Sequence, residues 1–331
     1  MPLGEHSVSV IIPTYNRADI LSHTLKSYIQ PHVVEIIVVD DASPDHMEEL
    51  VPGLRAECPV PIKYLKHDRR MGSQISKNDG ASMAVGDYVL IGEDDVLLAD
   101  DYIELLLESI VTRGASIAAG DCLDVNIPGG THGLAEKEIT DFEIRENPAV
   151  GGCIFLELEA GSETPVETPN LCAIALIHNS LLGKLAFDPG YRWNSFREET
   201  DFYYRALDLG ETLVYVPDAR CYHLRGNTWD TGGHRRLGGD RLAISLFRLV
   251  NTWRFLYRNR RIVKKVSGHN WIYNCYRYVF CRLARPDRHS SAFLTLSAFV
   301  ITLGMQVLAA ASAFYPQRTS YRKGSPWRAG S

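Results

Sequence analysis

The chain has 331 residues, of which 45% are hydrophobic and 23% are charged. This composition is typical of a soluble globular protein and argues against an intrinsically disordered chain. The net charge of -5 gives no support to nucleic-acid binding, and none of the seven cysteines forms a CxxC pair, so neither a zinc site nor a disulfide framework is indicated. Dispersed cysteines fit a reducing compartment. No secretory leader is expected, because the N-terminus runs straight into a predicted strand.

The first part of the chain alternates between predicted strands and predicted helices. Short apolar runs predict the strands, and apolar residues at helical spacing predict the helices. The order β-α-β-α-β-α-β predicts an open, mostly parallel sheet with right-handed crossovers. The predicted strands are 7–13, which we expect to end at Pro13, then 33–39, 62–65 and 88–91, and the predicted helices are 18–29, 47–54 and 73–84.

Polar clusters follow three of these strands at their carboxyl ends, at 13–17, 40–45 and 93–95. Ligands bind beyond the carboxyl ends of strands in such sheets, so we expect the three clusters to converge. The chain has neither a GxGxxG motif after the first strand nor a Walker loop, which argues against a dehydrogenase and a P-loop enzyme. A bound diphosphate would instead need a metal ion and carboxylates.

The third cluster is a run of three acids, Glu93, Asp94 and Asp95. Extended residues alternate faces, so Glu93 and Asp95 should point the same way and Asp94 the other way. Neighbouring carboxylates repel each other unless a cation lies between them. Taken alone, the run is better explained by a solvated acidic turn, and a site for a divalent cation that carries a diphosphate is the alternative.

Four motifs in this order resemble the signature of the family 2 glycosyltransferases, which have the GT-A fold. The resemblance covers about the first third of the chain, with a further match near residue 200. The motifs are IIPTYNR at 11–17, VVDDASPD at 38–45, KNDG at 77–80, and GDY at 86–88 leading into the acids at 93–95.

The resemblance implies a nucleotide-diphosphate sugar as the donor, most simply linked to UDP or GDP. Asp41 would accept a hydrogen bond from the base, and Asp40 would support the same loop. A helix cap or turn role is the structural alternative for Asp40. The residues implied to contact the donor are Pro13, Thr14, Tyr15, Arg17, Asp40, Asp41, Lys77, Asn78, Glu93 and Asp94.

The resemblance also implies a metal site for Mn²⁺ or Mg²⁺. The family's metal motif is Asp-x-Asp, and Glu93 replaces its first Asp; the longer side chain would move it towards the ribose or a water. Asp95 is then the implied metal ligand. Many relatives complete the site with a histidine after a later strand, and His223, which follows the predicted strand 213–219, matches it. A lone histidine is otherwise a packed or surface residue. Carboxylate, imidazole and phosphate oxygen are suitable ligands for these ions.

A second acidic cluster lies where a helix is predicted to begin, near Glu198. The family has Glu-Asp-x-Asp-Leu here, and this chain has EETDF at 198–202. The second acid is the family's usual catalytic base, so the resemblance implies that Glu199 deprotonates the acceptor, with Glu198 as the second candidate. The structural alternative is that acids in the first turn stabilise the helix dipole.

Beyond this cluster, the loop 228–239, with Arg225 and Asn227, is either a lid over the diphosphate or an ordinary solvated loop. Other predicted elements are helices at 101–112 and 242–257 and a strand at 116–120.

The chain changes character at residue 240. Ten Lys and Arg but only one acid occur over 254–288, and the 24 residues 292–315 carry no charge. About 20 apolar residues span a bilayer. This segment could therefore cross the membrane, lie in its interface or pack in a helical bundle. We expect membrane contact, with the basic flank facing anionic cytoplasmic lipid.

The sequence thus predicts an α/β protein. Residues 1–239 would form a GT-A domain, with a nucleotide-binding half at 1–115 and an acceptor half at 116–239, and residues 240–331 a helical, basic and partly hydrophobic region. The expected activity is metal-dependent, inverting transfer of a sugar to a hydroxyl of a lipid-linked, cell-envelope or glycoprotein glycan. The expected location is the cytoplasmic face of a membrane, either peripheral or with one C-terminal anchor.

Two alternatives stay open. A non-catalytic nucleotide-sugar-binding relative is suggested by glutamate replacing aspartate in both acidic motifs. A sugar nucleotidyltransferase would usually have a Gly-rich basic loop after the first strand, which this chain lacks.

Overall fold

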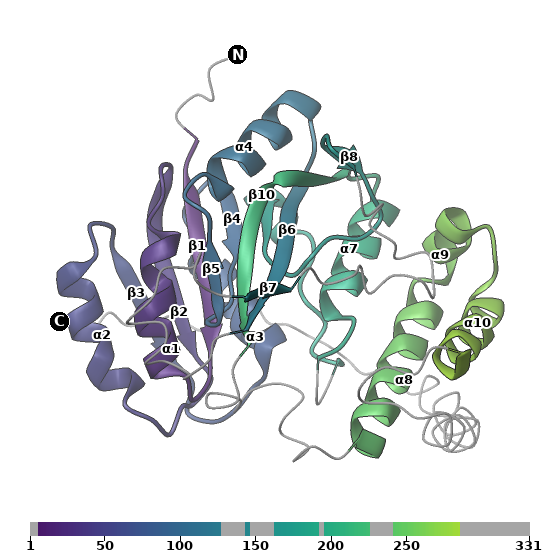
Figure 1. Cartoon of the computed structure of the whole chain (residues 1–331), viewed down its shortest axis with the longest axis horizontal. Helices are drawn as coiled ribbons and strands as arrows, with labels where there is room; N and C mark the ends of the chain where they lie inside the picture. The colour runs from purple at the N-terminus through teal and green to yellow at the C-terminus, as the bar shows by residue number, and fades with distance from the viewer. Residues whose placement is uncertain (1–5, 127–142, 146–161, 192–194, 226–240, 285–331) are drawn as a thin grey trace.

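The computed structural model describes residues 6–126, 143–145, 162–191, 195–225 and 241–284. Within these residues one ten-stranded sheet has the order β3-β2-β1-β4-β9-β6-β10-β5, with β7 paired to β6 and β8 paired to β10 (Figure 1). The strands are β1 (Val8–Thr14), β2 (Val33–Asp40), β3 (Ile62–Lys66), β4 (Tyr88–Ile91), β5 (Val96–Leu98), β6 (Ile117–Asn126), β7 (Glu143–Arg145), β8 (Val166–Glu167), β9 (Ala175–His178) and β10 (Leu213–Arg225).

Helices connect and cover these strands. Those described are α1 (Ala18–Thr24), the 3₁₀ helix η1 (Leu25–Tyr28), α2 (Met47–Glu57), α3 (Ser73–Met83), α4 (Tyr102–Arg113), α6 (Asn179–Leu182), α7 (Glu198–Asp208), α8 (Arg241–Arg258), α9 (Arg260–Ser267) and α10 (Trp271–Ala284).

The first four strands form the parallel half of the sheet. β1 pairs in parallel with both β2 and β4, and β2 pairs in parallel with β3. β9 is antiparallel to its neighbours β4 and β6, while β6 and β10 are parallel to each other. The predicted α/β fold is confirmed, and its parallel pairing is interrupted at β9.

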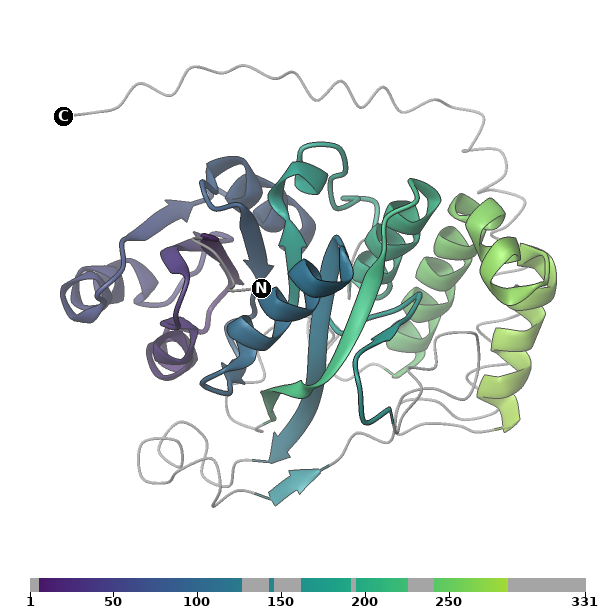
Figure 2. The same ribbon diagram turned by 90° about the horizontal axis from the view of Figure 1, so that it is seen from above.

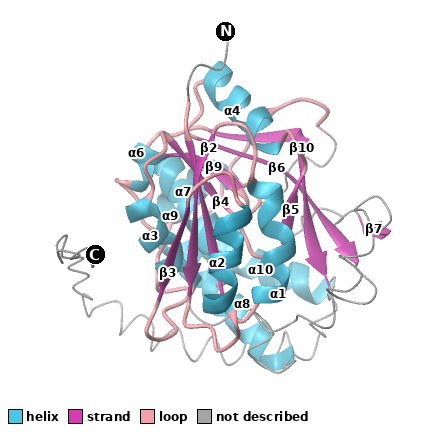
Figure 3. Cartoon of the chain, turned by 90° about the vertical axis from the view of Figure 1, so that its left-hand side faces the viewer, coloured by secondary structure: helices cyan, strands magenta, loops and turns pink. Residues whose placement is uncertain are grey.

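Helices cover both faces of the sheet (Figure 3). Alternate residues of β1 enter different cores, because successive side chains of a strand point to opposite faces. Val10 and Ile12 pack in the core that also contains residues of α1, α2 and α4, whereas Ile11 packs in the core that contains residues of α7. This arrangement leaves the carboxyl ends of the strands available for a site.

The helices α8, α9 and α10 pack beyond α7 and form the far side of the molecule from β3 (Figures 1 and 2). They share a third core with two tyrosines that precede α8 in the chain, Tyr191 and Tyr204. The helical region predicted after residue 240 is present over 241–284. In the described part of the chain, no helix is both long and apolar enough to cross a membrane. The segment 292–315 and the predicted lid loop 228–239 lie outside the described residues.

Two predicted boundaries were wrong. The first strand does not end at Pro13 but continues to Thr14, which pairs with Asp40. Proline is tolerated because the β4 partner extends only to Ile11, so the missing N–H removes no bond of that ladder. The helix predicted over 18–29 is α-helical only to Thr24 and continues as η1.

Candidate active site

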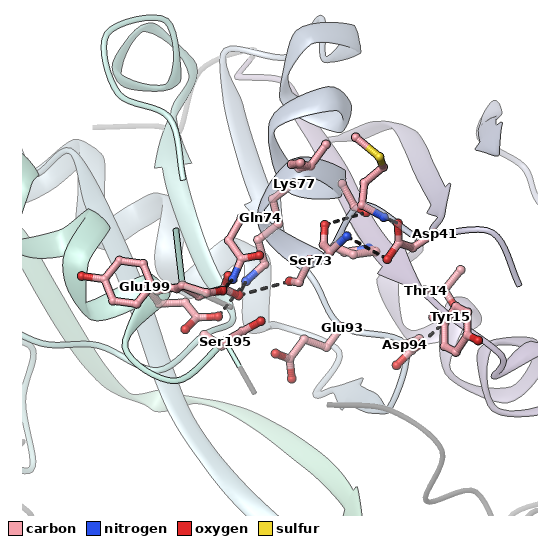
Figure 4. Close-up of a pocket in the computed structure, with 18 of the residues that line it drawn as sticks. Thr14, Tyr15, Asp41, Ser73, Gln74, Lys77, Glu93, Asp94, Ser195 and Glu199 are labelled. Atoms are coloured by element: carbon pink, nitrogen blue, oxygen red, sulfur yellow. Dashed lines mark hydrogen bonds and ion pairs between the residues drawn. The ribbon is translucent and has the colours of Figure 1, made fainter. Parts of the chain in front are cut away.

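A cavity of about 1020 Å³ lies at the carboxyl ends of the parallel strands. Of the fourteen candidate residues from the sequence, all but Asp40 and Asn78 line this cavity. Figure 4 shows Thr14, Tyr15 and Asp94 towards one end and Glu199 with Lys77 towards the other. The predicted convergence of distant motifs therefore occurs in one cavity.

The three consecutive acids divide between two sets of partners. Asp94 accepts a hydrogen bond from Thr14 Oγ1 at 2.9 Å. Glu93 and Asp95 each bring a carboxylate oxygen into a cluster with a ring nitrogen of His223, and these ligand atoms lie within 4.8 Å of one another. The alternation predicted for the run is thus present, and Glu93 joins the candidate metal ligands.

Strand pairing brings His223 to the acids. Residue Val96, which begins β5, pairs with His223 in β10, so Asp95 lies beside the imidazole. His223 Nε2 is 3.4 Å from Asp95 Oδ2, and His223 Nδ1 is 3.0 Å from Asp124 Oδ1. Asp124 lies opposite His223 in the β6–β10 ladder. A carboxylate behind a histidine fixes its ring orientation for a metal bound at the other nitrogen.

The donor atoms fit a divalent cation. Two carboxylate oxygens and an imidazole nitrogen suit Mn²⁺, and the carboxylates also suit Mg²⁺. Burial, together with the charge of Asp95, raises the pKa of Glu93 to about 7. Burial disfavours the charged imidazole, but Asp95 and Asp124 outweigh it and raise the pKa of His223 well above its ordinary value. Without another cation, this cluster therefore retains protons.

Arg17 also reaches the acids. Its Nη1 donates to Asp94 Oδ1 at 2.7 Å and to Asp95 Oδ2 at 2.8 Å. Burial alone would raise the pKa of the Asp95 carboxyl, but Arg17 and His223 outweigh burial and hold that pKa well below its ordinary value. Asp95 is therefore the ionised member of the run.

Asp40 and Asp41, at the end of β2, are held by hydrogen bonds from their own loop, from β3 and from the segment before α3. Asp41 accepts hydrogen bonds from the backbone N–H groups of Met71 and Gly72 at 2.6 and 2.9 Å, and lines the cavity. Asp40 accepts from Ser43 N at 2.7 Å and from Tyr64 at 2.7 Å. Asp40 does not line the cavity, so it supports the loop and is not placed to touch a ligand.

An arginine covers the neighbouring aromatic ring. The Arg70 guanidinium lies 3.5 Å from the centre of the Tyr15 ring, and both residues line the cavity. This end of the cavity therefore offers a flat aromatic and guanidinium surface beside the Asp41 carboxylate, which suits a planar ring such as a nucleobase.

The opposite end contains the second acidic cluster. Lys77, with a side chain 2% exposed, donates to Glu198 Oε1 at 2.8 Å and to Glu199 Oε1 at 2.7 Å. Glu198 is 3% exposed and Glu199 23% exposed. Burial outweighs Lys77 and raises the pKa of Glu198 to about 8. At Glu199, burial is outweighed by Lys77 and the pKa is lowered. Glu199 is thus the ionised and accessible carboxylate.

Asn78 has a different position from the one expected. Its side chain donates to the carbonyl of Phe187 at 2.9 Å and accepts from the N–H of Phe187 at 2.8 Å. These bonds tie α3 to the segment before α7. The structure gives no support to Asn78 as a donor contact.

The part of the chain that contains the four motifs also matches a known family in sequence. The sequence model of the family described as Glycosyl transferase family 2 matches residues 9–156. This part of the chain is therefore similar to the family 2 glycosyltransferases. The matched residues include the acids at 93–95, while Glu199 and His223 lie beyond them.

Named glycosyltransferases are similar to the same part. GlyG of Streptococcus pneumoniae is 30% identical over 118 residues, which cover 34% of this chain and 38% of GlyG. A glucosyltransferase of Campylobacter jejuni, named for GalNAc(5)-diNAcBac-PP-undecaprenol, is also 30% identical over 118 residues, covering 35% of this chain and 38% of that protein. The similarity thus spans well under half of these relatives.

The fold extends further than the sequence similarity. The mannosyltransferase PcManGT of Pyrobaculum calidifontis, solved with GDP-Man and Mn²⁺, matches with a TM-score of 0.53 and 17% identity, over 94% of this chain and 81% of that one. The chain therefore has the GT-A fold of these glycosyltransferases.

Two contacts of the candidate site were not predicted from the sequence. Asp124 was missed because the strand 116–120 was expected to end at Gly120, whereas β6 continues to Asn126. The alternation of residues past Gly120 was the available signal. The contact of Arg17 with Asp95 joins residues far apart in sequence, and no local pattern indicates it.

The raised pKa of Glu198 predicts a pH effect on stability. Between about 4.5, its ordinary pKa, and about 8, its folded pKa, the unfolded chain loses this proton while the folded chain keeps it. Stability contributed by Glu198 therefore falls as pH rises through this window, by up to about 1.4 kcal/mol per pH unit. In urea unfolding at pH 5 to 8, Glu198→Gln should gain stability relative to the unaltered protein as pH rises. Exposed Glu57→Gln is the control; a constant difference for Glu198→Gln would contradict the raised pKa.

Proposed function

We propose that the protein is a metal-dependent glycosyltransferase. It takes a sugar from a nucleotide-diphosphate sugar, linked to UDP or GDP, and transfers it to a hydroxyl of a lipid-linked, cell-envelope or glycoprotein glycan. The observation that carries the proposal is one cavity that contains both a cluster of candidate metal ligands and an ionised, accessible carboxylate, Glu199.

In this proposal, the nucleobase lies near Tyr15 and Asp41, and the diphosphate lies near Arg17 and the cation cluster. Glu93, Asp95 and His223 would hold the ion, with Asp124 orienting the imidazole. A bound divalent ion supplies charge stabilisation for the leaving diphosphate. The protein itself contributes fixed positions, because these side chains come from the ends of packed strands.

Glu199 acts as the general base. It accepts the proton of the acceptor hydroxyl while the hydroxyl oxygen forms a bond to the anomeric carbon. The bond from that carbon to the diphosphate oxygen breaks in the same step, and the nucleoside diphosphate leaves. Attack from the face opposite the leaving group inverts the anomeric carbon. The lowered pKa of Glu199 keeps the base ionised at neutral pH.

Donor binding tests the proposal directly. A panel of nucleotide sugars is titrated by calorimetry with and without Mn²⁺, and turnover is then followed with an acceptor panel. We expect one nucleotide class to bind in a Mn²⁺-dependent way, and Asp95→Asn to weaken that binding at least about tenfold, as loss of metal-site residues does. Asp100→Asn, at an exposed position nearby, is the control. The proposal fails if no nucleotide sugar binds. Binding without transfer would favour a non-catalytic relative.

We also propose that the C-terminal helices contact an anionic membrane at its cytoplasmic face. In this proposal the described helices bind the membrane surface and do not span it. One helix, α9, exposes four cations, and α10 exposes three large side chains that could enter the interface. The cations are Arg260, Arg261, Lys264 and Lys265, and the α10 side chains are Ile272, Tyr273 and Tyr276.

Vesicle co-sedimentation tests this contact. Each cation near an anionic surface contributes about 1 kcal/mol, so Lys264→Gln with Lys265→Gln should weaken binding to phosphatidylserine vesicles roughly 30-fold. The matched control replaces two other exposed lysines, Lys26 and Lys184. Equal binding of both double variants, or equal binding to uncharged phosphatidylcholine vesicles, would reject the contact.

A further inference from the structure

The acidic run already has a cation of its own. Arg17 is 12% exposed and contacts Asp94 and Asp95, whose side chains are 7% and 8% exposed. Buried carboxylates persist as anions only when paired. Lys77, a buried lysine that lines the same cavity, is paired with Glu198 and Glu199 at the other end. The Arg17 guanidinium is therefore the principal counter-charge of Asp94 and Asp95.

The same carboxylate oxygen faces both Arg17 and the candidate metal ligands. Asp95 Oδ2 accepts from Arg17 Nη1 at 2.8 Å, and it is also the Asp95 oxygen that lies 3.4 Å from His223 Nε2. A cation bound between Asp95 and His223 would use the oxygen that Arg17 holds. Two positive groups on one carboxylate oxygen also repel each other.

Arg17 has an alternative ligand within the cavity. It lines the cavity beside Thr14 and Tyr15, at the proposed donor end. Its Nε is buried and has no hydrogen-bond partner among the described residues. A guanidinium binds phosphate oxygens in a fork of two hydrogen bonds, so a diphosphate is a suitable replacement for the carboxylates.

We propose that Arg17 and a divalent cation compete for Asp95, so that the cation enters the cavity together with a nucleoside diphosphate, which takes over the Arg17 guanidinium. The inference rests on the proposed metal and diphosphate site and adds an order to its assembly. Arg17 is then more than a donor contact: it neutralises the acids before the ligand arrives and couples cation binding to diphosphate binding. Such coupling is reciprocal, so the cation must also strengthen nucleotide binding by the same factor.

Direct Mn²⁺ binding, followed by the electron paramagnetic resonance of free Mn²⁺, tests this order without any activity assay. Mn²⁺ is titrated into the full chain, first alone and then with UDP or GDP at a fixed concentration, and the affinities are compared on the scale of free Mn²⁺. We expect the unaltered protein to bind Mn²⁺ at least tenfold more tightly with the nucleotide. We expect Arg17→Gln to bind Mn²⁺ alone at least tenfold more tightly than the unaltered protein, and to gain less from the nucleotide.

A double variant and a second single variant separate the possible failures. If Arg17→Gln binds Mn²⁺ but the double variant Arg17→Gln with Asp95→Asn does not, the ion binds at Asp95 and the site is correct. If Arg17→Gln then binds Mn²⁺ no more tightly than the unaltered protein, only the competition is overturned. If the double variant binds Mn²⁺ as well as Arg17→Gln, the ion is not at Asp95, which overturns both the site and the inference. Should Arg17→Gln not fold, Arg17→Lys, which keeps one charge without the fork, is expected to show a smaller gain. Equal Mn²⁺ affinity of the unaltered protein with and without nucleotide overturns the inference without any variant.

Discussion

Replacing Glu199 with glutamine is expected to lower the rate of sugar transfer by about 10²- to 10⁴-fold while nucleotide-sugar binding persists. Glutamine has nearly the same shape but cannot accept a proton, and general-base catalysis contributes about this factor. Glu199 is the more exposed of the two adjacent acids, and its pKa is lowered because Lys77 outweighs the effect of burial. The measurement is the turnover number with the donor and acceptor found by screening.

Glu198→Gln is the matched control for this experiment. Glu198 is 3% exposed, and burial raises its pKa to about 8, so it is protonated at neutral pH and cannot act as the base there. We expect its replacement to change turnover by less than about tenfold, below the range for a general base. A larger loss for Glu198→Gln than for Glu199→Gln would reverse the two roles.

Replacing Lys77 with methionine is expected to lower the free energy of unfolding by about 3 kcal/mol or more at pH 7. Lys77 is buried between Glu198, which is protonated at this pH, and the ionised Glu199. Removing one partner of a buried ion pair costs about 3–5 kcal/mol, because the remaining charge, here that of Glu199, is left without compensation. Glu199 keeps partial access to solvent, which places the expected value near the lower limit. The loss should be measured by urea unfolding.

A surface lysine with an ion pair of the same length provides the control. Lys66 contacts Glu48 at 2.7 Å, but the two side chains are 37% and 70% exposed. Exposed pairs contribute about 0–1 kcal/mol, so Lys66→Met should have little effect. Equal losses for Lys77→Met and Lys66→Met would show that burial does not set the strength of the Lys77 pairs. Lys77→Met should also raise the pKa of Glu199 and move the acid limb of the rate profile to higher pH.

Local patterns were sufficient to predict elements that have a strong repeat in the sequence. The strand at 88–91 has the predicted position because its apolar run is visible in the sequence, and α7 begins at Glu198 as its helical repeat predicts. The strands β5 and β9 were missed. They have three and four residues, and they are defined by pairing with strands distant in sequence.

For the candidate site, the sequence predicted which residues line the cavity but not which residues contact one another. The family motifs indicated which residues would line the cavity, since the carboxyl ends of parallel strands meet at one edge. They did not indicate the partners of those residues. Lys77 was expected at the nucleotide but contacts Glu198 and Glu199, and Glu93 was expected away from the metal but lies with Asp95 and His223. Such pairings depend on three-dimensional register and charge balance, which a linear motif does not contain.

The central claim is that one cavity binds a nucleoside diphosphate through a cation held by Asp95 and His223. Crystals grown with Mn²⁺ and the nucleotide that binds most tightly, measured on both sides of the manganese absorption edge, test it most directly. We predict one strong anomalous peak bonded to Asp95 and His223, with the diphosphate beside it and the base near Tyr15. Nucleotide bound in this cavity with no manganese at these two residues, or manganese and nucleotide bound elsewhere, would contradict the account.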